Sequence, residues 1–168
     1  MKKTLVNLFA ILLALPVMGL AQQGGFAGIY TRMGMGPRGM AMGNAMTAVP
    51  VEGSYAHYNP AIAAYDTARI QADVSTAAMN FDRSLHMLNG AFPLTGGAAV
   101  NFTLMNANVN DIDGRTRSGY HTGMLSTHEI QFKTYVGLRY TSWLMAGAGV
   151  GIQYAKLHED VPSSTGAG

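Results

Sequence analysis

Three groups of residues in this sequence have types and spacings that could support ligand binding. The first is Gly34-x-Gly36-x-x-Gly39, which matches the fingerprint of a dinucleotide-binding loop. Such a loop needs a preceding strand and an acidic residue about 20 positions later, and the sequence offers neither. We therefore expect these glycines to form irregular backbone rather than a phosphate cradle.

The other two groups contain potential metal ligands, one of methionines and the other of acidic residues and histidines between positions 111 and 129. Five methionines could bind Cu(I) through their thioether sulfurs. They are Met33, Met35, Met40, Met42 and Met46. Asp111-Ile112-Asp113-Gly114 resembles the start of a calcium loop, but Thr122 stands where that loop needs a bidentate acid. His121, His128 and Glu129 fit no common zinc spacing. Apolar packing of the methionines and solvated loops are the favoured interpretations, so we predict no metal and no cofactor.

The composition argues against a soluble enzyme. The absence of cysteine excludes disulfides, thiolate metal sites and cysteine catalysis. No serine, histidine and acidic residue stand in a recognisable context such as a nucleophile elbow. Charged residues make up 12% of the chain, about half the usual globular share, and 21 of the 168 residues are glycine. We predict a protein without enzymatic activity, with a composition that suits a membrane barrel.

Residues 1–21 are typical of a cleaved secretory signal peptide. Lys2 and Lys3 precede an apolar run from Leu5 to Leu15, and Gly19-Leu20-Ala21 offers small residues for cleavage after Ala21. The run is shorter than the roughly 18–20 residues that a membrane-spanning helix needs. Loss of the two lysines reduces the 11 basic residues to 9, equal to the 9 acidic ones. The basic excess therefore belongs to the export signal, and we expect no nucleic-acid partner.

From Arg69 onward, apolar and polar residues alternate with a period of two. Five runs of about 9–15 residues have the length of tilted membrane strands. They lie around Ile70–Ala78, Leu85–Phe92, Val100–Leu104, Glu129–Tyr140 and Leu144–Tyr154. The inward positions are mostly polar: Gln71, Asp73, Asn101, Gln131, Lys133 and Gln153. Short turns at Phe92–Gly96 and Tyr140–Trp143 contrast with a long polar loop expected at residues 106–125. The pattern predicts an all-β, antiparallel transmembrane β-barrel in the cell outer membrane.

Residues 22–66 lack this alternation. They are rich in glycine and methionine, and we expect one short helix near Arg38–Ala48 within otherwise irregular backbone. We predict three parts: a signal peptide at 1–21, a plug segment at 22–66 and the first barrel strands at 67–168. Five strands cannot close a barrel, because the smallest single-chain barrels have eight. The chain is then either the N-terminal portion of a longer protein or one of several copies that assemble a barrel.

Two parts of the N-terminal segment carry a family resemblance. Gly34-Met35-Gly36-Pro37-Arg38-Gly39-Met40-Ala41-Met42-Gly43-Asn44-Ala45 and Tyr58-Asn59-Pro60-Ala61, with Ala48-Val49 between them, resemble the N-terminal signature of the PorV/PorQ family. That family is related to the FadL-type fatty-acid transporters. Pro50-Val51-Glu52 and Ile62-Ala63 depart from the family pattern. The resemblance implies a closed barrel whose N-terminal segment folds into the lumen as a plug. The residues that it assigns to this structural and gating role are Gly34, Gly36, Arg38, Gly39, Gly43, Asn59, Pro60 and Ala61.

The resemblance also implies a choice of functions. PorV-like members serve type IX secretion, so we expect a protein that binds secreted cargo or translocon proteins, in contact with outer-membrane lipid. The alternative is a FadL-like channel for long-chain fatty acids or other hydrophobic small molecules, and the polar inward positions argue modestly against it. A structural outer-membrane protein without transport activity is the third hypothesis.

Overall fold

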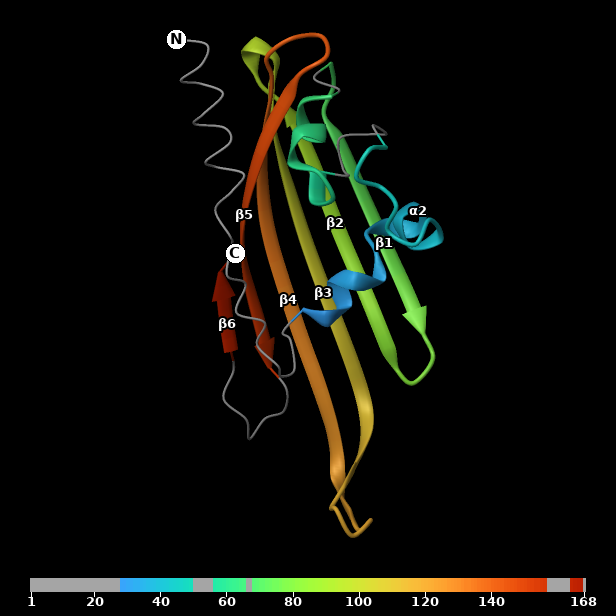
Figure 1. Cartoon of the computed structure of the whole chain (residues 1–168). Helices are drawn as coiled ribbons and strands as arrows, with labels where there is room; N and C mark the ends of the chain where they lie inside the picture. The colour runs from blue at the N-terminus through green and yellow to red at the C-terminus, as the bar shows by residue number, and fades with distance from the viewer. Residues whose placement is uncertain (1–27, 50–55, 66–67, 157–163, 168) are drawn as a thin grey trace, which may run out of the picture.

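A computed structural model describes residues 28–49, 56–65, 68–156 and 164–167 of the chain. They contain one antiparallel sheet of six strands, with a short N-terminal region lying against one of its faces (Figure 1). The strands are β1 (Gln71–Met79), β2 (Arg83–Pro93), β3 (Ala98–Arg115), β4 (His121–Arg139), β5 (Met145–Lys156) and β6 (Ser164–Ala167). Each strand pairs with the next one along the chain, so the sheet is a simple meander.

The predicted antiparallel all-β fold is confirmed, and each of the five predicted runs forms a strand. The short strand β6 was not predicted. Within the described residues the sheet is open, because β1 pairs only with β2 and β6 pairs only with β5. Closure into a barrel therefore stays a prediction. The predicted signal peptide lies outside the described residues.

One face of the sheet, the outer face, carries a continuous band of exposed apolar side chains. This face consists of the even-numbered strand positions of residues 72–108 and 128–154, and the apolar ones among them form the band. A row of directly paired residues crosses the five long strands: Val74, Leu88, Leu104, Phe132 and Ile152. Each of them is between 38% and 72% exposed. The Phe102 ring stacks on that of Phe132 with a centroid distance of 6.2 Å, which joins this row to the next. Large apolar groups thus cover the face that the rest of the described chain leaves open.

The opposite face, the inner face, consists of the odd-numbered positions of the same strands and is covered by the N-terminal region. Four of its most buried side chains are polar: Asn89, Asn101, Thr103 and Gln131, each at most 5% exposed. The Thr103 hydroxyl donates to the Asn89 side-chain oxygen at 3.0 Å, and the Gln131 amide donates to Gln153 at 3.2 Å. These bonds run between paired strands and partly satisfy groups that burial would otherwise leave without partners.

Two residues of the second predicted run do not belong to the outer face. Leu85 and Met87 point to the inner face and are almost fully buried, whereas Phe92 in the same strand is exposed on the outer face. Leu85 and Met87 pack with Tyr30 and Met35 of the N-terminal region, so tertiary packing explains their position.

The predicted loop at residues 106–125 is mostly strand. β3 continues to Arg115 and β4 begins at His121, with irregular pairing between Val109 and Ile112. A tight turn closes this hairpin, in which Gly119 N–H donates to the Thr116 carbonyl at 2.9 Å. Backbone pairing with a neighbouring strand overrides the turn-rich composition of this stretch. The hairpin extends past the β1–β2 connection (Figure 1).

Short helices punctuate the rest of the described chain. The N-terminal region contains the 3-10 helices η1 (Ile29–Met33) and η3 (Pro60–Ala64) and the α-helix α2 (Gly36–Ala41), and η4 (Thr95–Gly97) lies between β2 and β3. The helix expected near Arg38–Ala48 therefore begins earlier and ends sooner. It ends because Gly43 and Asn44 adopt positive φ angles of 58° and 69°, which an α-helix cannot contain. No helix in the described part is long and apolar enough to cross a membrane.

Candidate functional site

The candidate site is the contact between the inner face and the docked segment, which we define as the described residues 28–49 and 56–65. At the end of the sheet where β1 turns into β2, the Gly28 N–H donates to the Glu129 carboxylate on β4 at 2.7 Å. Farther along, the Gly36 N–H donates to the sulfur of Met87 on β2 at 3.1 Å. Polar contacts thus attach the docked segment to separate strands of the sheet.

Tyr58 holds the two halves of the docked segment together. Its hydroxyl accepts from the Met35 N–H at 2.5 Å and donates to the Asn44 side-chain oxygen at 2.7 Å. The Asn44 amide in turn donates to the Arg32 carbonyl at 2.7 Å. Burial raises the pKa of Tyr58 above its ordinary value, so the hydroxyl stays protonated and keeps both bonds. Gly39 lies directly against this hydroxyl, and any Cβ at that position would collide with it.

Asn59 and Pro60 begin η3. The Asn59 side chain accepts from the Ala61 N–H at 3.1 Å, which caps the helix, and donates to the Thr47 carbonyl at 3.0 Å. Pro60 occupies the first helical position, where a missing N–H has no cost. Asn59 therefore both begins η3 and attaches its first turn to the first half of the docked segment.

The far end of η3 is attached to β4 near the β4–β5 turn. The Arg139 guanidinium donates to the Ala64 carbonyl at 3.0 Å and also to the carbonyl of Tyr65. Gly137 and Gly147, paired across β4 and β5, let the η3 backbone approach the sheet closely. At Gly137 a Cβ would lie 2.7 Å from the Ala64 nitrogen. The arginine and the two glycines together form a receptor surface for η3.

His57 is a half-buried titratable group of this site. Its Nδ1 lies 3.1 Å from the Tyr135 hydroxyl on β4, and its ring meets those of Tyr58 and Tyr135 edge to face. Burial lowers the pKa of His57 to about 4, with a second contribution from the charge of Lys133. The imidazole is therefore neutral at pH 7, and docking excludes its charged form.

The eight predicted plug residues have different places. Gly34, Gly36 and Gly39 are buried in the first half of the docked segment, and Asn59, Pro60 and Ala61 form the start of η3. Arg38 and Gly43 are exposed. Tyr58, which is also part of the sequence motif, directly precedes Asn59, and its hydroxyl lies against Gly39 of the first half. The gating role assigned to these residues stays a prediction.

The candidate metal ligands are not brought together. Met35 is buried beside Met87 and Met105, whereas Met33 and Met42 are exposed. His128 and Glu129 are neighbours in β4 and therefore point to opposite faces of the sheet. The Asp113 carboxylate contacts Arg115 and His121 in the exposed hairpin. Among the described residues no group of three or more His, Cys, Asp or Glu side chains could hold a metal ion.

No protein-family model, curated protein or solved structure matches this chain. The resemblance to the PorV/PorQ family therefore rests on the sequence motif alone. Sequence reasoning did not predict that Glu129 and Arg139 contact the docked segment, or that His57 of the docked segment contacts the sheet. Glu129 and Arg139 stand at inward positions of a predicted strand, which was a usable signal. His57 had none, because its partner Tyr135 is 78 residues away.

Proposed function

We propose that this protein is an outer-membrane β-barrel protein of PorV/PorQ type that acts in protein secretion or surface attachment by binding partner proteins. One observation carries the proposal: the polarity of the sheet is reversed relative to a soluble sheet. Its open face is apolar, and its covered face contains buried polar side chains. Lipid on the outer face and a protein-filled interior on the inner face account for both properties.

The height of the apolar band supports a membrane location. On β4 it runs from Ile130 to Leu138, about 27 Å along the strand at about 3.4 Å per residue. A tilt of about 40° reduces this to about 20 Å, close to the roughly 25 Å band of outer-membrane barrels. Tyr140 and Trp143, both strongly exposed, follow one end of the band, where an aromatic girdle belongs. In the row at the other end, Thr76, His86 and Asn106 on β1–β3 are polar, and Ile130 and Tyr154 continue the apolar band on β4 and β5.

The β3–β4 hairpin supports partner binding. It extends beyond the apolar band as a paired ribbon, and its exposed tip carries Asp113, Arg115 and His121, which contact one another. A ribbon held by backbone pairing presents these charges in a defined arrangement. Electrostatic complementarity of this kind gives specificity to protein recognition.

The docked segment favours this proposal over passage of hydrophobic molecules. It is attached to β2 and β4 by hydrogen bonds at both ends of the inner face. Opening a path would require these bonds to break and would expose the buried polar row of Asn89 and Thr103. A protein that binds partners without opening its interior keeps the bonds between the docked segment and the strands.

The proposal is tested in cells that express the full-length protein. We expect the protein in the outer-membrane fraction, resistant to carbonate extraction and showing heat-dependent gel mobility. Deleting the gene should remove specific proteins from the cell surface, and restoring it with residues 110–125 replaced by a short turn should leave the barrel in place without restoring them. A soluble protein, or an unchanged surface proteome after deletion, would contradict the proposal.

A further inference from the structure

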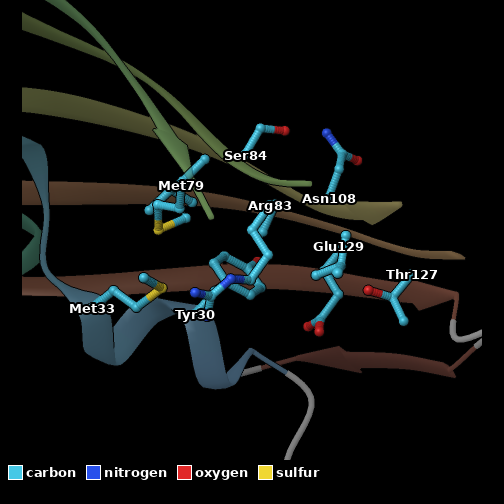
Figure 2. Close-up of a pocket in the computed structure, with 11 residues that line it drawn as sticks. Tyr30, Met33, Met79, Arg83, Ser84, Asn108, Thr127 and Glu129 are labelled. Atoms are coloured by element: carbon cyan, nitrogen blue, oxygen red, sulfur yellow. The ribbon is translucent and has the colours of Figure 1, made fainter. Parts of the chain in front are cut away.

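A cavity of about 320 Å³ lies between η1 and the inner face, at the β1–β2 end of the sheet. Apolar side chains from the docked segment and from three strands form most of its wall: Met33, Met79, Leu85 and Val109. Figure 2 shows Tyr30 and Met33 on the helix facing Met79, Arg83 and Glu129 from the strands. Its volume lies at the lower end of the range for small-molecule pockets, roughly 300–1,000 Å³.

Tyr30 in this wall has an unsatisfied polar group. The residue is 6% exposed, and its buried hydroxyl has no hydrogen-bond partner among the described residues. A buried hydroxyl without a partner is costly, and native proteins rarely leave one. Burial, together with the negative charge of Glu129, raises the pKa of Tyr30 above its ordinary value. The hydroxyl therefore remains protonated and is available as a donor.

The charges around the cavity balance one another. Arg83 and Glu129 both line it, one with a positive and the other with a negative group. The Glu129 carboxylate already accepts the Gly28 N–H, and Arg83 Nε already donates to the Asn80 carbonyl. Because the two charges offset each other, the cavity offers an ion little net attraction to replace its lost hydration, whereas a neutral ligand loses much less on burial.

We propose that this cavity binds a small, neutral, largely apolar molecule whose carbonyl-type oxygen accepts a hydrogen bond from Tyr30. The ligand packs against the methionines of η1 and β1, which are adaptable apolar walls. Since Arg83 is exposed and its side chain runs toward Tyr30 (Figure 2), we expect this side chain to move as the ligand enters.

The inference is independent of the secretion proposal. It requires only that η1 lies against β1–β4, so a protein without a role in surface attachment could still bind the ligand. A bound molecule would bridge the docked segment and the sheet, and it would therefore stabilise their contact by mass action.

The test uses the full-length protein in lipid nanodiscs with ¹³C-labelled methionine methyl groups. Three probes of similar size are compared: 4-phenylbutanamide, 4-phenylbutanoate and butylbenzene. We expect the amide to shift the Met33 and Met79 signals saturably and to leave Met145, at the opposite end of the sheet, unchanged. The carboxylate should bind at least about tenfold more weakly, because burial removes its hydration and the balanced charges of Arg83 and Glu129 do not replace it. Equal shifts at Met145, or tighter binding of the carboxylate, would overturn the proposal.

Tyr30→Phe isolates the hydrogen bond. It should weaken binding of the amide about tenfold and leave butylbenzene unaffected, because one hydrogen bond of about 1.4 kcal/mol corresponds to that factor. Tyr120→Phe, at the exposed hairpin tip, is the matched control and should change neither affinity. Ala107→Leu fills the cavity and should abolish the shifts at both methionines. Unchanged amide affinity in Tyr30→Phe, or persisting shifts in Ala107→Leu, would show that the ligand does not occupy this cavity.

Discussion

The outer and inner faces of this sheet belong to the same strands, yet they follow opposite patterns. On the outer face Phe132 and Ile152 are 40% and 60% exposed, whereas Gln131, next to Phe132 in β4 but on the inner face, is 5% exposed. A half-exposed antiparallel sheet in water places apolar residues inward and polar residues outward. The reversal teaches that the environment of the outer face, rather than a protein core, selects its apolar residues.

The inner face differs from the outer face in being mixed, with both polar and apolar side chains. Its polar groups are buried, and some of them are paired across strands through bonds such as that from Thr103 to Asn89. The same face also contains an apolar cluster of Leu85, Met87 and Met105 where Tyr30 and Met35 lie. The inner face is therefore shaped to fit one particular segment of the chain, while the outer face is uniform.

A charge in the centre of the outer face should break this contrast most strongly. Phe132→Arg places a cation in the apolar band, and arginine at the midplane of a membrane barrel costs about 2–4 kcal/mol. We expect a loss of that size in the free energy of unfolding, measured by urea titration of the protein in lipid vesicles. Met124→Arg, on the same strand but in the protruding hairpin, is the control and should have little effect. A neutral or stabilising Phe132→Arg would mean that water contacts this face.

Acidification should loosen the cover of the inner face. Burial lowers the pKa of His57 from 6.5 to about 4, so the docked segment favours the neutral ring. This contribution to docking is fully present above pH 6.5 and is lost as the pH falls toward 4, by about 3 kcal/mol in total. Hydrogen exchange of residues 56–65, corrected for intrinsic rates, should report the loss. His57→Gln should remove the pH dependence in this window, and exchange of the wild-type protein that does not respond to pH would contradict the assignment.

Gly39→Ala should displace the two halves of the docked segment from each other. The new Cβ would collide with the Tyr58 hydroxyl, and such overpacking costs about 1–3 kcal/mol. Protection of residues 28–49 from exchange should fall, while that of the strands should not. Adding Tyr58→Phe removes the colliding oxygen and should make the second substitution less costly than it is alone. If the losses of protection caused by the two substitutions were strictly additive, the contact between Gly39 and Tyr58 would not be the cause of the Gly39→Ala effect.

Asn59→Ala should have the smallest effect. It removes the cap of η3 and the bond to the Thr47 carbonyl, with an expected loss of about 1 kcal/mol in docking. Asn59→Asp keeps the oxygen that caps the helix and should retain part of that energy. Equal losses for the two variants, again measured by exchange of residues 56–65, would contradict the capping role.

The regular part of the fold could be predicted from the sequence because a strand imposes a period of two. Gln71, Asp73, Gln131 and Gln153 were correctly placed on one face from this alternation alone. The β3–β4 hairpin was missed because Asp113 and Gly114 are typical turn residues, and only their pairing with Met124 and Gly123 places them in the sheet. The inward position of Leu85 was not predicted, since local alternation does not reveal that Tyr30 packs against it.

The candidate site was predictable only where the chemistry is local. The capping by Asn59 and the helical position of Pro60 follow from neighbouring residues. The attachment of Ala64 to Arg139 joins residues 75 positions apart, and no periodicity in the sequence encodes it. Such a contact can be predicted only when the pairing of the strands is already known.

The central claim is that lipid touches the even-numbered positions of β4 and that the odd-numbered ones face the protein interior. Because the chain contains no cysteine, single cysteines at residues 130–138 can carry spin labels without a background. In lipid vesicles, oxygen should relax the labels at the even positions strongly, and a water-soluble nickel complex should relax them weakly, with a period of two. Strong relaxation of the even positions by the nickel complex, or no alternation at all, would contradict the account.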